Sequence, residues 1–96
     1  MHLYTNRYTD YLSHARVQPL EDPMFMLIDA QQKADSPQQA YAALAMLFYI
    51  QSEALGLNIS DTLGYIGNSI SHMKNTDTQK MRALSMYIRK EMEPDA

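Results

Sequence analysis

The sequence contains no cysteine, no tryptophan and only three glycines among its 96 residues. Without cysteine the chain has no disulfide, no thiolate nucleophile and no cysteine-ligated zinc, which fits a reducing compartment. The packing of side chains must therefore stabilise whatever fold the chain adopts.

Long apolar segments and an excess of basic residues are also missing. The longest unbroken apolar run, Ala40 to Ile50, is about half of the ~20 residues that a membrane-spanning helix needs. No basic region precedes an apolar stretch near the N-terminus, as it would in a secretory signal. The formal net charge of −3 disfavours a nucleic-acid-binding domain, since such domains usually carry a basic excess. We therefore expect a cytoplasmic protein with no membrane partner.

The length and composition fit a single helical domain over residues 1–96. The hydrophobic fraction of 46% and the charged fraction of 20% are close to globular averages. A domain of this size buries roughly 60–65% of the surface that its unfolded chain exposes. The chain should therefore have enough apolar mass to form its own core.

Apolar residues recur at helical spacing along the whole chain, and no segment alternates apolar and polar residues over more than a few positions. The pattern predicts an all-α fold, a compact single-domain bundle of four to five helices. The expected helices cover about residues 3–16, 23–34, 37–55, 61–74 and 77–93.

Capping residues set the expected helix boundaries. Residues 36–39 read Ser-Pro-Gln-Gln, a capping box with proline at the first helical position, and Gly56 can supply the left-handed residue that ends the same helix. Asp22, Ser60 and Thr76 are the expected N-caps of the second, fourth and fifth helices.

The run from Ala40 to Ile50 leaves the helix at about 37–55 without a polar face. Such a helix is expected at the centre of the bundle, buried by its neighbours on all sides. Gly64 and Gly67 in the following helix each cost about 1 kcal/mol relative to alanine. We expect them where a neighbouring backbone comes very close.

No motif for catalysis, a metal or a nucleotide is present. His2, His14 and His72 lack a partner at the three- or four-residue spacing of a helical metal site. Glu53, the only charged residue between Ser36 and Ser60, is the one candidate for a buried acid, although a solvent-facing position explains it as well. We therefore expect no enzyme activity, no cofactor, no metal and no small-molecule substrate.

Tyrosine and methionine are more numerous than the inner faces of five helices require. Both residue types are favoured at interfaces; the alternative is that they fill the core and its boundary. The leading hypothesis is a non-catalytic protein-binding module: a regulator, adaptor or inhibitor that covers a larger partner, or a self-associating homodimer. The candidate partner-binding residues lie on the first and fifth helices: Tyr4, Tyr8, Tyr11, Lys80, Arg82, Met86, Tyr87 and Arg89.

The alternative hypothesis is a helix-turn-helix-type DNA-binding regulator. Five basic residues stand against Asp77 alone between positions 74 and 90, and the helix at 37–55, its turn and the next helix imitate the motif's layout. Against this, the expected recognition helix carries Asp61 and no arginine, and its turn is long for the motif.

Overall fold

The computed structural model describes residues 3–73 and 75–92, with side chains over 7–73 and 77–92. Within these ranges the chain forms five α-helices and a short 3-10 helix, and no strand. The elements are α1 (Leu3–Ser13), η1 (Gln18–Leu20), α2 (Glu21–Gln31), α3 (Pro37–Ala54), α4 (Ile59–Ser71) and α5 (Asn75–Met92). The predicted all-α bundle is confirmed.

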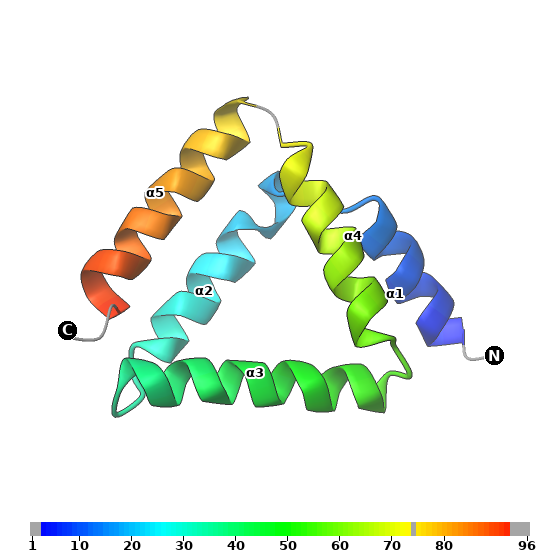
Figure 1. Ribbon diagram of the computed structural model, residues 1–96, viewed down its shortest axis with the longest axis horizontal. Coiled ribbons are helices and arrows are strands. Elements are labelled where there is room, and N and C mark those ends of the chain that lie inside the picture. Colours follow the sequence, from blue (N-terminus) through cyan, green and yellow to red (C-terminus); the bar gives the residue numbers. More distant parts are fainter. Residues whose placement is uncertain (1–2, 74, 93–96) are drawn as a thin grey trace.

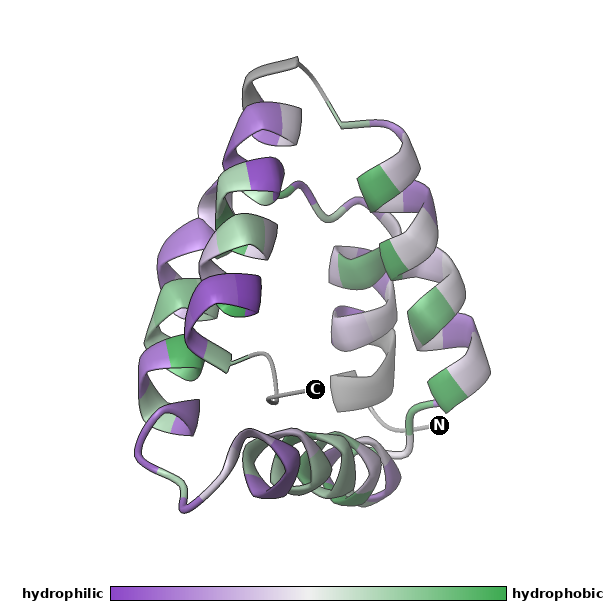
Figure 2. Cartoon of the chain, turned by 60° about the vertical axis from the view of Figure 1, so that its left-hand side comes forward, coloured by the Kyte–Doolittle hydropathy of each residue, from purple (hydrophilic) through white to green (hydrophobic). Residues whose placement is uncertain are grey.

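The helices are arranged as a triangle (Figure 1). α2 and α5 form one side and run in the same direction, α1 and α4 form the second side in the same way, and α3 crosses the base. Figure 2, turned by 60°, shows the same two pairs on either side, with α3 running away from the viewer across the base. The chain measures 45 × 32 × 21 Å along its principal axes.

Both predicted ends of the helix at 37–55 are confirmed. The Ser36 hydroxyl accepts a hydrogen bond from the Gln39 N–H at 3.1 Å, and Gln39 Oε1 accepts one from the Asp35 N–H at 2.9 Å. At the other end Gly56 adopts the left-handed φ of 69°. These interactions are local, which is why the sequence alone locates them.

Three other predicted caps are wrong. Asp22 lies inside α2, because η1 leads into that helix with no extended residue between them. Asn58 rather than Ser60 caps α4, since its Oδ1 accepts a hydrogen bond from the Asp61 N–H at 2.9 Å. Thr76 lies inside α5, which begins one residue earlier.

The predicted burial of the helix at 37–55 is also wrong. Only two residues of α3, Ala40 and Ser52, are buried. The flanking helices leave from its two ends, so that no helix of the described chain lies along its outer side (Figure 1). Five large apolar side chains of α3 are therefore exposed: Tyr41 (72%), Met46 (68%), Leu47 (55%), Tyr49 (58%) and Ile50 (63%).

The chain buries less surface than a folded monomer of its size. Its accessible surface is 7773 Å², compared with about 5,600 Å² for a typical monomer of 11.0 kDa and about 16,000 Å² for the unfolded chain. It therefore buries about half of that surface rather than the expected 60–65%. The radius of gyration of 14.7 Å likewise exceeds the ~12.5 Å typical of 96 residues. The buried side chains of the described residues are Val17, Ala40, Ser52, Thr62 and Leu84.

The glycines of α4 do not mark a close helix contact. A Cβ atom built at Gly64 or at Gly67 meets nothing within 4 Å, and both residues are exposed. The expected approach of a neighbouring backbone is therefore wrong, because α4 packs against α1 with a different face.

No helix within the described ranges has, on its own, the length and apolar character needed to cross a bilayer. α3 and α4 reach that threshold only when taken together, as a pair bent by 114°.

Candidate protein-binding surface

The outer side of α3 carries a continuous apolar stripe. Ala43, Met46, Leu47 and Ile50 follow the i, i+3, i+4, i+7 spacing that brings side chains onto one face of a helix. All four are exposed. We refer to these four residues as the outer stripe.

The opposite side of α3 holds the helix against the rest of the chain. Ala40, Leu44, Phe48 and Ser52 recur every four residues; Ala40 and Ser52 are buried, and Leu44 and Phe48 are half-buried. At 3.6 residues per turn, this inner row lies roughly 130° around the helix from the outer stripe. α3 is thus apolar on every side between residues 40 and 50, and the chain covers only the inner row.

The outer stripe contains no charge. Glu53 is the only residue of α3 that is charged at neutral pH. It is exposed and lies near the C-terminal end of the helix. Its interpretation as a buried acid is therefore wrong, and the solvent-facing alternative is confirmed. An uncharged apolar patch on a protein surface is typical of a contact with another macromolecule.

The tyrosines predicted as partner-binding residues lie on α1. Tyr8 and Tyr11 are 41% and 55% exposed and line a shallow hollow together with Arg7 and Leu12. The side chain of Tyr4 lies outside the described residues. These tyrosines belong to the α1/α4 side of the triangle and are not part of the outer stripe (Figure 1).

Three of the predicted residues of α5 come together around one hollow. Arg82, Met86 and Arg89 line a hollow of about 370 Å³ with Met73 and Met81. Met86 is 65% exposed, and both arginines are exposed. The structure therefore leaves these residues accessible, but on a different side of the triangle from the tyrosines of α1.

The remaining two predicted residues link α5 to α2. Lys80 Nζ lies 3.2 Å from Glu21 Oε2, and the Tyr87 hydroxyl donates a hydrogen bond to Gln32 Oε1 at 3.2 Å. Lys80 and Tyr87 therefore already have partners within the chain. Any contact that they make with another protein would compete with these two polar interactions.

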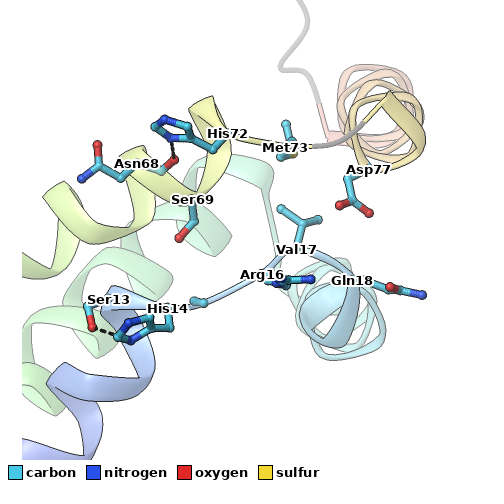
Figure 3. Close-up of a pocket in the computed structure, with 11 residues that line it drawn as sticks. Ser13, His14, Arg16, Val17, Gln18, Asn68, Ser69, His72, Met73 and Asp77 are labelled. Atoms are coloured by element: carbon cyan, nitrogen blue, oxygen red, sulfur yellow. Dashed lines mark hydrogen bonds between the residues drawn. The ribbon is translucent and has the colours of Figure 1, made fainter.

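A third hollow, of about 370 Å³, lies where the two sides of the triangle meet (Figure 3). Two histidines line it, but each is engaged at the end of its own helix. His72 Nδ1 lies 2.8 Å from the Asn68 carbonyl oxygen, and His14 Nδ1 lies 3.1 Å from both the Asp10 carbonyl oxygen and Ser13 Oγ. No cluster of three metal-ligating side chains occurs among the described residues. We therefore interpret this hollow as a junction of helix ends.

Comparison with known proteins found no matching protein family, no similar curated protein and no similar solved structure.

Proposed function

We propose that the protein is a non-catalytic protein-binding module, which acts by placing the outer stripe of α3 against an apolar surface of another polypeptide. The observation that carries this proposal is an exposed, uncharged apolar face on a chain that buries only about half of its surface. A regulator, adaptor or inhibitor of this kind needs no active site of its own.

The three large side chains of the outer stripe contribute part of the binding energy that such a role requires. Full burial of a leucine, isoleucine or methionine stabilises by about 1.5–3 kcal/mol. Met46, Leu47 and Ile50 are 68%, 55% and 63% exposed, so that covering them contributes roughly 3–6 kcal/mol in total. A cluster of this size is comparable to the few central residues that dominate many protein interfaces.

The charge of α3 favours a protein over a lipid or a nucleic acid. Helices that lie on membrane surfaces usually carry lysine and arginine on their polar side, and nucleic-acid-binding surfaces use the same residues to contact phosphates. α3 contains neither lysine nor arginine. Its exposed face therefore fits an apolar protein surface better than an anionic one.

Photo-crosslinking in the cells that make the protein tests this proposal. A photoreactive amino acid at Met46 should form a covalent adduct with another polypeptide, because this side chain lies in the outer stripe. The same substitution at Met26 is the matched control, since Met26 on α2 is 70% exposed and lies outside the stripe. Equal labelling at the two positions, or no adduct at Met46, would contradict the proposal.

A helix-turn-helix-type DNA-binding regulator is the second candidate. α3 and α4 meet at 114° across the four-residue turn of residues 55–58. The expectation that this turn is too long is therefore wrong, because both the angle and the turn length are within the range of the motif. Retention on DNA at low salt, lost in a Lys80→Glu, Arg82→Glu double variant, would support this function. A chain that is not retained at low salt would exclude it.

A further inference from the structure

We infer that the polypeptide covering the outer stripe of α3 is a second copy of this chain, and that the two α3 helices pack antiparallel about a two-fold axis. The inference rests on the proposed function and names its partner. It follows from the surface left exposed, from the pattern of the stripe and from the position of Glu53.

The excess of exposed surface, summed over the whole chain, is comparable with the area that one partner of a stable dimer buries. The accessible surface of 7773 Å² exceeds that of a typical 11.0 kDa monomer by about 2,200 Å². One partner contributes about 800 Å² to a standard interface and roughly 1,000–2,500 Å² to an obligate homodimer. Obligate interfaces resemble a domain core that is divided between two chains. Few side chains of this chain are buried within the described residues.

The outer stripe is complementary to itself when the helices run antiparallel. A two-fold axis between Met46 and Leu47 places Ala43 level with Ile50 of the second copy, and Ile50 level with its Ala43. The small side chain thus meets the large one on both sides of the axis, which allows close packing of the helices. Met46 and Leu47 meet their own copies at the centre of the contact.

The single charge of α3 favours the antiparallel direction. In that register Glu53 lies level with residue 40 of the second copy, in the first turn of its α3. The N–H groups at a helix N-terminus favour a nearby negative charge. A parallel pair would instead bring the two Glu53 side chains next to each other, where like charges repel.

Because the wild-type chain contains no cysteine, a single cysteine substitution can test the dimer by disulfide formation. All other residues of the contact keep their wild-type identity. Each cysteine introduced by substitution is the only one in its chain, and a disulfide requires Cα atoms about 4.4–6.8 Å apart. A Leu47→Cys chain should form a disulfide with its own copy in a glutathione redox buffer, because residue 47 lies beside the axis. An Ala43→Cys chain should not, because a rise of 1.5 Å per residue separates its two copies by about 10 Å along the helices.

A mixture of Ala43→Cys and Ile50→Cys chains should form a disulfide between the two variants, since these two positions face each other only in the antiparallel register. Tyr41→Cys, on another side of the same helix and 72% exposed, measures the background of random collisions. Mass spectrometry under non-reducing conditions identifies each species.

Two results would overturn the inference. One is disulfide formation by Ala43→Cys alone as readily as by Leu47→Cys, and the other is no disulfide above the Tyr41→Cys background at any position. The photo-crosslink at Met46 then decides the proposed function separately. An adduct with a different protein would support the proposed protein-binding function without the dimer. The absence of any adduct would contradict the proposed function as well.

Discussion

Truncation of Ile50 to alanine should dissociate the dimer without unfolding the chain. Ile50 is 63% exposed in the single chain, so most of its side chain is left for a partner to cover. Alanine is also a better helix former than isoleucine, which offsets part of the small loss of packing within the chain. The substitution therefore acts chiefly on the contact between copies.

The expected effect can be estimated from the atoms removed. The substitution deletes three side-chain carbons, each worth about 0.8 kcal/mol when fully buried, or about 1.5 kcal/mol together at the 63% exposure of Ile50. A two-fold contact contains the residue twice, so that the dimer loses about 3 kcal/mol. The dissociation constant should rise on the order of 100-fold, since each 1.4 kcal/mol corresponds to a factor of ten.

Sedimentation equilibrium over a range of protein concentrations measures this change, and far-ultraviolet circular dichroism checks that the helices persist. Ile70→Ala is the matched control, because Ile70 is 49% exposed on α4 and lies outside the outer stripe. A change in the dissociation constant of less than about threefold for Ile50→Ala would refute the reasoning, and so would an equal change for Ile70→Ala.

Three further predictions concern the stability of the chain and are measured by urea unfolding. Gly64→Ala should raise the free energy of unfolding by about 0.5–1 kcal/mol, because the added Cβ meets nothing within 4 Å. Asn58→Ala should lower it by about 1 kcal/mol through loss of the cap of α4, whereas Ser60→Ala should leave it nearly unchanged. A double-mutant cycle on Lys80 and Glu21 should give a coupling of at most about 1 kcal/mol that weakens with added salt, since the lysine side chain is 52% exposed.

The features that local chemistry controls could be predicted from the sequence. The cap at Ser36 and the left-handed Gly56 depend on residues within one turn, and both occur where expected. Helical periodicity also predicts that Met81, Leu84, Ser85, Ile88 and Met92 share the inner face of α5. Leu84 is buried and the other apolar residues are half-buried, whereas Ser85 is exposed.

The environment of α3 could not be predicted in the same way. A helix that is apolar on every side is stable when other residues bury all of its faces. The run from Ala40 to Ile50 does not show whether those residues belong to the same chain or to another. Short connections place α2 and α4 at the two ends of α3, so neither lies along its outer stripe (Figure 1). The same run that predicts a buried central helix therefore provides the candidate binding surface.

The chemistry of the candidate residues on α1 and α5, rather than their position, is what the sequence shows. Tyr8, Tyr11 and Met86 are exposed, as a binding role requires, but exposure alone does not test that role. Lys80 and Tyr87 illustrate the difficulty, since their partners on α2 are more than fifty residues away in the sequence.

The molar mass of the purified chain in solution, measured by light scattering during size-exclusion chromatography, tests most directly whether a second copy covers α3. Two chains of 11.0 kDa give about 22 kDa, and we expect this mass for the wild type. A single species of 11.0 kDa at every concentration would contradict the dimer.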